Sequence, residues 1–218
     1  PGEVSLASDG VLFLDELPEY QRSTLETLRQ PLEDGVITVS RATGTYEYPA
    51  NFMLVASMNP CPCGNYGSKD VDCTCSATAI QNYLKRLSGP LLDRIDLKID
   101  VERVAFFDLS SKELEEPSSE IKKRVDKARQ IQNERFKNSH IHTNAKMNSK
   151  MLELFCKLDV ESENLMKIAF DRFHISARGY TRILKVARTI ADLDGAENIE
   201  SKHLTEALAY RNIDKFQM

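Results

Sequence analysis

Residues 10–16, GVLFLDE, give the clearest indication of the fold class. Four consecutive apolar residues, from Val11 to Leu14, are followed directly by Asp15 and Glu16. A short, continuous apolar run is typical of a strand buried on both faces of a parallel sheet. Open α/β sheets bind their ligands at the edge where such strands end. The segment therefore predicts an α/β protein with two carboxylates at a candidate binding edge.

The α/β pattern continues to residue 105. Pairs such as Asp34-Gly35 and Gly89-Pro90 mark turns between its periodic stretches. The elements predicted here are, in order, a helix over residues 18–34, a β-hairpin over 37–48, a second buried strand over 51–58, a helix over 76–87 and a third strand over 95–101.

The rest of the chain has a different, helical pattern. The chain is polar from Glu102 to Ser119 and contains Ser-Ser-Lys-Glu and Glu-Pro-Ser-Ser there, which is typical of a linker between domains, assigned to residues 106–118. Beyond this linker, helices are predicted over residues 119–137, 149–158, 162–173, 176–193 and 202–211, the last with Ser201 as its N-cap. Residues 119–218 are therefore predicted to form an all-helical domain.

The composition excludes several classes of protein. The chain has 218 residues, 41% hydrophobic and 28% charged, with a net charge of -4; such values exclude collagen-like and disordered chains. No apolar stretch approaches the ~20 residues of a membrane helix, and no secretory leader is visible, so we expect a cytoplasmic protein without a membrane partner. Up to Ala105 there are 9 basic and 15 acidic residues, against 20 and 18 afterwards. A uniformly basic nucleic-acid-binding protein is thus excluded, whereas a basic loop or channel face within an oligomer stays open.

Polar residues at the ends of the two predicted strands are the first candidates for chemistry. Asp15 could hold the Mg²⁺ that bridges nucleotide phosphates, and Glu16 could polarise the attacking water as a general base. The amide of Asn59, after the second strand, could orient that water. The alternatives are solvated acids at a strand end and an ordinary turn asparagine before Pro60.

Two arginines are candidates for contacts with a nucleotide. Arg94 lies where a predicted helix gives way to a strand, and its guanidinium could reach the nucleotide of a neighbouring subunit; a surface ion pair with Asp93 or Asp96 is the alternative. Arg178 and Arg182 are four residues apart near a predicted helix start, where the helix dipole disfavours cations. Their position predicts that an anion lies nearby.

Four segments together resemble one family. GVLFLDELPE, LRQPLEDG, ITVSRATGTYEYPANFMLVASMNPCPCG and GPLLDRID are similar to the magnesium-chelatase-type AAA+ ATPases, in the ComM/YifB branch. The resemblance implies a partial AAA+ sheet followed by a helical lid. It also implies that Asp15 and Glu16 form the Walker B pair, Asn59 is sensor 1, Arg94 is the arginine finger and Arg178 is sensor 2.

The same resemblance implies the partners and cofactors. Family members use ATP and Mg²⁺, and the branch is associated with DNA branch migration. A ring, expected to be a hexamer, would turn ATP hydrolysis into movement on DNA. Residues 41–48 fall on the pre-sensor-1 hairpin, which in related helicases points into the central pore.

The sequence departs from the family pattern in one respect. No G-x-x-x-x-G-K-[ST] motif, and no Gly-Lys pair, occurs in it. Family members carry this loop upstream of the segments that match. Because its backbone N–H groups and lysine hold the nucleotide phosphates, we expect this chain alone to bind ATP poorly and not to hydrolyse it.

The cysteines predict a metal site independently of the family. Cys61 and Cys63 form one C-x-C pair, Cys73 and Cys75 form another, and the nine residues between the pairs are rich in turn formers. Four thiolates can complete a tetrahedral Zn²⁺ site, although C-x-x-C is the usual spacing. Disulfides are the alternative, but they are rare in the cytosol. Cys156 lies in an apolar helical stripe and is expected to be a core residue.

Three other functions stay open. An enhancer-binding transcription activator has a similar Walker B segment, but neither the cysteine loop nor LLDRID is expected in it. A chelatase motor subunit that inserts Mg²⁺ into a porphyrin is disfavoured by the cysteine loop. A non-catalytic, zinc-bearing nucleic-acid-binding module is disfavoured because the aromatic content is 7% with no Trp, and stacking on bases needs aromatic rings.

Overall fold

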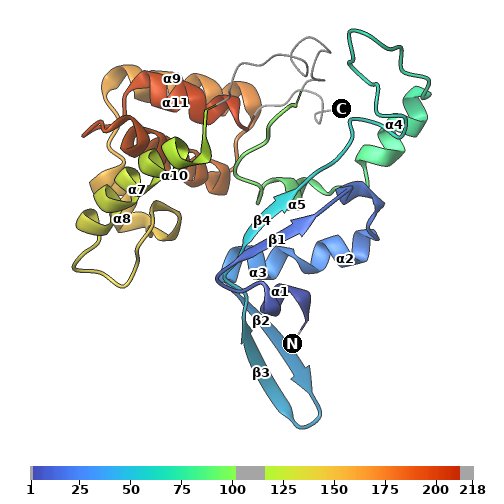
Figure 1. Ribbon diagram of the computed structural model, residues 1–218, viewed down its shortest axis with the longest axis horizontal. Coiled ribbons are helices and arrows are strands. Elements are labelled where there is room, and N and C mark those ends of the chain that lie inside the picture. The colour runs from blue at the N-terminus through green and yellow to red at the C-terminus, as the bar shows by residue number, and fades with distance from the viewer. Residues whose placement is uncertain (1, 102–115, 212–218) are drawn as a thin grey trace. The chain divides into compact units, whose positions relative to one another are not determined.

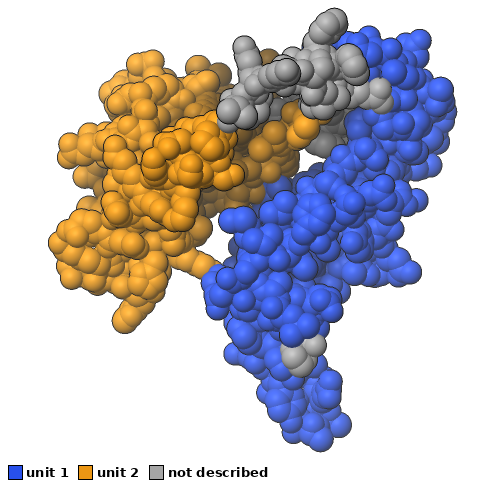
Figure 2. Space-filling view, viewed as in Figure 1, with its two compact units in different colours: residues 1–95, 214–218 blue, residues 96–213 orange. Residues whose placement is uncertain are grey.

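A computed structural model describes residues 2–101 and 116–211. These residues fall into two compact units, one that ends at Ile95 and one that begins at Asp96 (Figure 2). Most of the predicted linker, residues 106–115, lies outside the described residues. Within the described ranges, no helix has both the length and the apolar character that crossing a membrane requires.

The first unit contains the predicted pair of parallel strands. β1 (Val11–Leu14) pairs with β4 (Met53–Ala56), in a register that runs from Val11 opposite Met53 to Leu14 opposite Ala56 (Figure 1). Leu12 and Leu14 pack on an apolar cluster formed by Leu17, Leu25, Leu28, Leu87 and Leu91. The carboxyl ends of both strands therefore lie side by side at one edge.

The prediction that these strands are buried on both faces is wrong for the described part of the chain. Val11 and Phe13 are each 59% exposed, and their register partners Met53 and Val55 are 64% and 40% exposed. The leucine cluster packs on the other face. One face of the two-stranded sheet is thus covered and the other is open.

The third strand, predicted over 95–101, does not form. Residues 96–101 have no regular secondary structure, and this segment does not join the described sheet, which contains only β1 and β4. Instead, the backbone N–H of Lys98 donates to the carbonyl oxygen of Tyr210 at 2.8 Å. The side chains of Leu97, Ile99 and Val101 remain 48%, 67% and 85% exposed, so the segment is anchored through its backbone and not by burial of its apolar residues.

The predicted helix over 18–34 is divided into three short pieces. They are the 3₁₀ turn η1 (Leu17–Glu19) and the helices α2 (Arg22–Thr27) and α3 (Arg29–Asp34). Pro31 has no N–H to donate to the carbonyl of Thr27, so a continuous helix would lack that bond. Gly35, with φ of 70°, then ends α3 in a left-handed conformation.

The hairpin and the helix predicted over 76–87 form as expected in type, and two short helices form that the sequence did not predict. β2 (Val36–Arg41) pairs antiparallel with β3 (Gly44–Pro49), which confirms the hairpin. The further described helices are α1 (Glu3–Leu6), α4 (Ala77–Leu84) and α5 (Gly89–Leu92). The hydroxyl of Ser76 caps α4, so this helix begins one residue later than predicted and ends three residues earlier.

The second unit is helical, as predicted. Its elements are α7 (Ser118–Arg135), η2 (Asn144–Lys146), α8 (Ser149–Phe155), α9 (Val160–Phe173), α10 (Ala177–Asp194) and α11 (Ser201–Ala209). The core centres on α10, where Ile183, Ala187 and Ala191 are 0% exposed. The apolar periodicity of the sequence therefore locates these helices correctly.

Ser201 does not cap α11, and this prediction is wrong. Glu200 is the N-cap, and its backbone N–H donates to Nδ1 of His203 at 3.0 Å. Since Nδ1 accepts, Nε2 carries the proton and donates to Asp194 at 3.1 Å. His203 thus closes the start of the helix.

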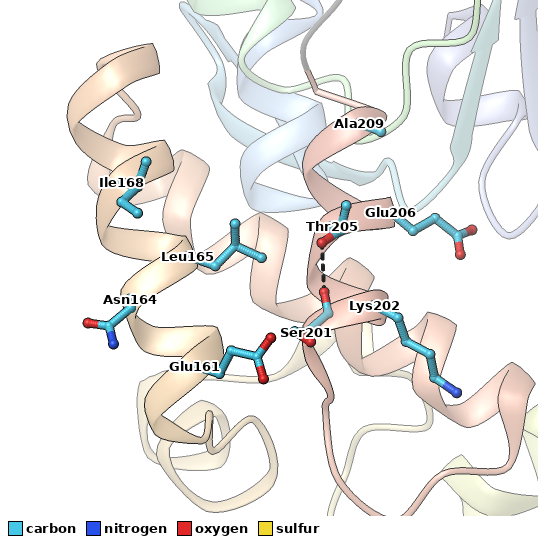
Figure 3. A pocket seen from close by; sticks show the side chains of 9 residues that line it. All are labelled: Glu161, Asn164, Leu165, Ile168, Ser201, Lys202, Thr205, Glu206 and Ala209. Carbon is cyan, nitrogen blue, oxygen red and sulfur yellow. Dashed lines mark hydrogen bonds between the residues drawn. The ribbon is translucent and has the colours of Figure 1, made fainter.

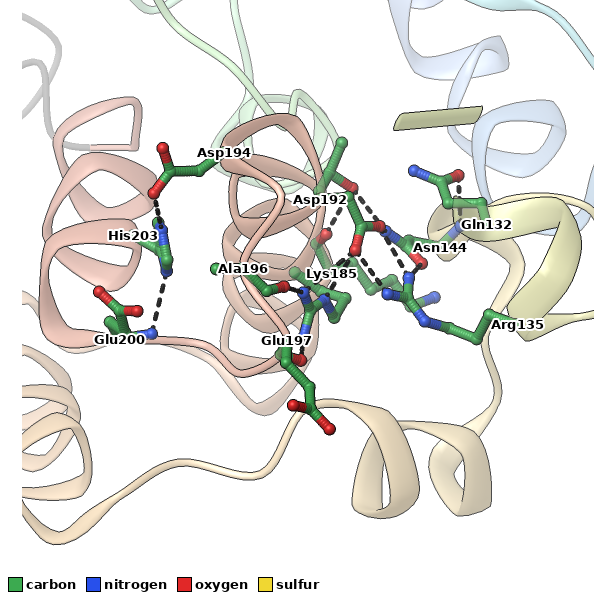
Figure 4. Close-up of polar contacts among 12 residues, drawn as sticks. Gln132, Arg135, Asn144, Lys185, Asp192, Asp194, Ala196, Glu197, Glu200 and His203 are labelled. Atoms are coloured by element: carbon green, nitrogen blue, oxygen red, sulfur yellow. Dashed lines mark hydrogen bonds and ion pairs between the residues drawn. The ribbon is translucent and has the colours of Figure 1, made fainter. Parts of the chain in front are cut away.

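A buried polar network joins α10 to α7 and η2 (Figure 4). The carboxylate of Asp192 accepts from Arg135, from Asn144 at 2.7 Å and from Nε of Arg188 at 3.1 Å. Arg188 also donates to the carbonyls of Ala196 and Glu197. This network fixes the turn after α10 and the segment before α8 to the same helix.

Candidate functional site

Asp15 lies where β1 ends and is held by the neighbouring strand. The hydroxyl of Ser57, the first residue after β4, donates to Oδ1 of Asp15. Two backbone hydrogen bonds reinforce this contact. The Ser57 N–H donates to the carbonyl oxygen of Leu14 at 3.0 Å, and the Leu17 N–H donates to the carbonyl oxygen of Ser57 at 2.9 Å. The carboxylate therefore has a fixed position at the carboxyl edge of the two strands.

Glu16 adopts an uncommon backbone conformation. Its φ and ψ of 50° and 52° are left-handed, a region that is costly for a residue with a side chain. Its N–H donates to Oδ1 of Asp15 at 3.1 Å and is 3.3 Å from the hydroxyl of Ser57. The chain turns sharply here, and the Glu16 side chain remains exposed beside the bound carboxylate of Asp15.

Asn59 lies at the base of the cysteine loop and next to α4. Its side-chain oxygen is 3.9 Å from the position that a Cβ on Gly64 would take. Burial raises the pKa of Tyr83 on α4, a hydrogen bond with the backbone of Asn59 lowers it, and the charges of Glu19 and Glu16 raise it further. Tyr83 is therefore close to both Asn59 and Glu16.

Sequence reasoning missed Ser57 and Tyr83. The sequence contained a signal for Ser57, because Ser57 directly follows β4 just as Asp15 directly follows β1. No local signal existed for Tyr83, whose contact with residue 59 spans the whole cysteine loop.

The guanidinium of Arg94 is largely enclosed within the first unit. Its side chain is 9% exposed and forms an ion pair with Glu33 at 3.3 Å. It also donates to the carbonyl of Arg29 at 3.1 Å and to that of Pro90 at 2.6 Å. Arg94, Arg29 and Glu33 border a polar hollow of about 390 Å³ that Glu26 and Asp34 also line.

The two arginines near the start of α10 have different surroundings. Ser176 caps this helix by accepting from Gly179 N–H at 3.0 Å. Arg178 is exposed. Arg182 is 17% exposed and pairs with Asp96 at 2.6 Å, so the anion expected near this pair is supplied, for Arg182, by the chain itself.

The four loop cysteines come together, as predicted. Their Sγ atoms all lie within 4.8 Å of one another, and the shorter separations are 3.4 Å, 3.7 Å and 3.6 Å for the pairs 61–63, 61–73 and 63–73. A tetrahedral zinc with Zn–S bonds of about 2.3 Å has sulfur–sulfur edges of about 3.8 Å. A disulfide needs about 2.05 Å, and all four cysteines are free. The donor set therefore fits a tetrahedral metal ion.

The loop backbone favours negative charge on one sulfur. Hydrogen bonds from the backbone of Asn65 and Thr74 lower the pKa of Cys63 to about 5. At Cys73 a hydrogen bond from the backbone of Cys75 is outweighed by burial and by the neighbouring thiols, which raise the pKa to about 12. Of these two thiols, Cys63 is therefore the one that ionises more readily when no metal is bound.

Cys156 has the core position that its sequence context predicts. It is 4% exposed on the apolar core of the helical unit, and burial raises its pKa to about 11. It is therefore an inert thiol.

The helical unit also has a groove of about 730 Å³ between α9 and α11 (Figure 3). Leu165 and Ile168 line one side, and Thr205 and Ala209 line the other. None of the candidate residues described above contributes to it.

The chain matches known proteins over all of its described residues. Residues 1–109 match the family model described as magnesium chelatase, subunit ChlI, and residues 115–211 match the model of its C-terminal part. The competence protein ComM of Haemophilus influenzae is 47% identical over 213 residues, which are 97% of this chain and 40% of that protein. The protein YifB of Escherichia coli is 45% identical over 216 residues, or 99% of this chain and 42% of that protein.

The chain thus spans about two-fifths of the length of these relatives. The segments that match include both strands that end in acids and amides, the cysteine loop and the helical unit. The chain therefore belongs to the magnesium-chelatase-like AAA+ family, in the branch of ComM and YifB.

Proposed function

We propose that this chain is the C-terminal part of an ATPase subunit that hydrolyses ATP with Mg²⁺ at the edge formed by β1 and β4. The observation that carries the proposal is the parallel register, since it sets Asp15 and Glu16 beside Ser57 at the carboxyl ends of adjacent strands. Ligands of open α/β sheets bind at this edge. The family supports the same reaction.

Each residue at the edge has a distinct role in this proposal. Carboxylate and hydroxyl oxygens suit Mg²⁺, so Asp15 and Ser57 would hold the ion, which when bound neutralises phosphate charge. Glu16 is exposed and would accept the proton of the attacking water. Asn59 would orient that water through its side-chain amide.

The test uses the complete ATPase polypeptide to which we assign this chain. Glu16→Gln keeps the shape of the side chain but cannot accept the proton, so hydrolysis should fall roughly 10²- to 10⁴-fold while ATP still binds. Asp15→Asn should instead weaken Mg²⁺-dependent binding. Glu19→Gln is the matched control, since Glu19 is three residues away in an exposed pair with Arg86. Equal activity of the Glu16 and Glu19 variants would refute the assignment.

Arg94 and Arg178 would complete the site in a ring of subunits, expected to be a hexamer. An arginine that neutralises transition-state charge on a neighbouring subunit is worth ~10³ to 10⁵ in turnover. Because its side chain is 9% exposed, Arg94 must leave Glu33 to reach such a nucleotide. Arg178 is exposed near the start of α10 and would bind phosphate in the ground state as well.

We further propose that the four cysteines of the loop bind one structural Zn²⁺. The sulfur–sulfur separations of 3.4–3.7 Å support it, being close to the tetrahedral edge of about 3.8 Å. Protein purified without a His-tag should contain about one zinc per chain, Cys61→Ser should lose it and Cys156→Ser should keep it. Near-zero zinc with pairwise oxidised cysteines would refute this site.

The movement that hydrolysis drives is proposed to take place on DNA. The relative ComM is a competence protein, and its name supports a role connected with DNA. The tip of the β2–β3 hairpin is exposed, including Arg41, and could contact a phosphate backbone. DNA should stimulate hydrolysis, and Arg41→Ala should reduce the stimulation but not the basal rate. Lack of any response to DNA would favour a chelatase-type motor instead.

A further inference from the structure

The segment that follows Arg94 is attached to the helical unit at two points. Oδ1 of Asp96 accepts a hydrogen bond from Nη1 of Arg182 at 2.6 Å. Two residues later, Lys98 N–H donates to the carbonyl of Tyr210 at 2.8 Å. Residues 96–98 must therefore move with α10 and α11 for as long as these bonds persist.

Arg94 itself is fixed in the first unit. Its guanidinium is bound to the carbonyls of Arg29 and Pro90 and to Glu33. Only Ile95 separates it from Asp96, and two residues of backbone span at most about 7 Å. Any displacement of Asp96 is thus transmitted to the Arg94 backbone with almost no slack.

α10 is rigid enough to transmit such a displacement. Arg178 and Arg182 are one turn apart on the same face. Behind them, Ile183 and Ala187 are 0% exposed in the helical core. If a bound ligand displaces Arg178 and the helix around it, Arg182 is therefore displaced as well.

Asp96 also interacts electrostatically with Lys185, a second cation of α10. Lys185, one turn after Arg182, has its pKa lowered first by burial and next by the Arg182 charge, while Asp96 raises it. The amine of Lys185 donates to the carbonyl of Ala145 at 2.9 Å. Asp96 therefore offsets the charge of two cations on α10, and its loss would leave these cations facing each other.

We propose that Asp96 and Arg182 are positioning residues that couple the helix bearing Arg178 to the loop bearing Arg94. The inference rests on the proposed function. Closure of the helical unit on a nucleotide would move Asp96 through Arg182 and so release or seat the Arg94 guanidinium. Neither residue touches the reacting atoms; both act on the placement of Arg94.

The test compares Asp96→Arg, Arg182→Asp and the double variant that exchanges the two charges, all in the complete ATPase. Each single variant should lower kcat by roughly 2- to 30-fold and leave the ATP dissociation constant within about twofold. The exchange should recover most of the lost kcat when turnover is measured well below the Tm of every variant, where a difference in stability does not limit the rate. Asp126→Asn is the matched control, because Asp126 forms an ion pair with Lys122 on α7 and is 53% exposed, close to the 49% of Asp96.

Two outcomes overturn the inference. One is that both single variants keep a kcat like that of the Asp126 control while Glu16→Gln is inactive; the other is that the exchange variant is no better than the worse single variant. A wild type without Mg²⁺-dependent ATPase would refute the proposed function rather than the coupling. In that case hydrogen exchange on the present chain decides, since the Lys98 amide should exchange faster in Arg182→Asp than in wild type and the Asp126 control.

Discussion

Replacing Asp192 by Asn should destabilise the helical unit severely. Asp192 is 1% exposed, and its carboxylate accepts hydrogen bonds from Arg135, Asn144 and Arg188. An asparagine has the same shape but carries no charge, and its NH₂ group would face guanidinium donors. The two arginines would then remain in the interior without an anion.

The magnitude follows from the burial of these charges. The side chains of Arg188 and Arg135 are 2% and 11% exposed, so water cannot replace the lost carboxylate. Breaking a buried ion pair by removing one partner costs about 3–5 kcal/mol. For a unit of about 100 residues, each 1 kcal/mol shifts Tm by roughly 4–8 °C, so a shift of roughly 12–40 °C is expected.

Urea and thermal unfolding followed by circular dichroism at the helix band measure this loss. Asp126→Asn again provides the control, because its ion pair with Lys122 is exposed and such pairs contribute about 0–1 kcal/mol. A loss for Asp192→Asn that is no greater than for this control would refute the reasoning. It would mean that the packing of α7 and α10 does not depend on the buried carboxylate.

Three further predictions concern the site, a helix cap and the thiols. Mixing inactive Arg94→Ala subunits with inactive Glu16→Gln subunits should recover part of the ATPase activity, because some interfaces in a mixed ring keep both Arg94 and Glu16. If size measurements verify mixed rings and no activity returns, Arg94 does not act on the nucleotide of a neighbouring subunit. Asp159 caps α9, and the N–H of Ser162 lowers its pKa below 3.8, so its contribution to stability is complete above pH 3.8 and is lost as the pH falls through the lowered pKa. The difference in Tm between wild type and Asp159→Ala should accordingly shrink in acid, and a constant difference would contradict the cap. In metal-free protein at pH 7, Cys63, with a pKa of about 5, should be alkylated well before Cys156, with a pKa of about 11, as followed by mass spectrometry. Bound zinc should protect Cys63 from alkylation. Equal alkylation rates of Cys63 and Cys156 in the metal-free protein would contradict the assigned pKa values.

Local patterns in the sequence were sufficient for most elements. The apolar run before Asp15 and the one before Asn59 predicted two strands, and the alternation around residues 42–43 predicted the hairpin. The helical unit was predicted because its apolar residues recur at helical spacing. The cysteine cluster was predicted because two C-x-C pairs on one short, turn-rich loop have little freedom to stay apart.

Failures occurred where an element depends on partners that are distant in the sequence. The run over 95–101 is apolar enough for a strand, but Lys98 bonds to Tyr210 instead. Ser201 is a good N-cap residue by type, yet His203 and Asp194 favour Glu200 at that position. In each case the competing contact comes from a residue that periodicity cannot identify.

The residues available for chemistry can thus be identified from local sequence patterns: the acids after β1, the amide after β4 and the four thiols. The surroundings of these residues depend on the folded chain. The tertiary structure assigned Ser57 to Asp15, Glu33 to Arg94 and Asp96 to Arg182. Secondary structure, and the clustering of residues within one loop, depend on neighbours along the chain. The partner of a charged side chain depends instead on which groups are buried together when the chain folds.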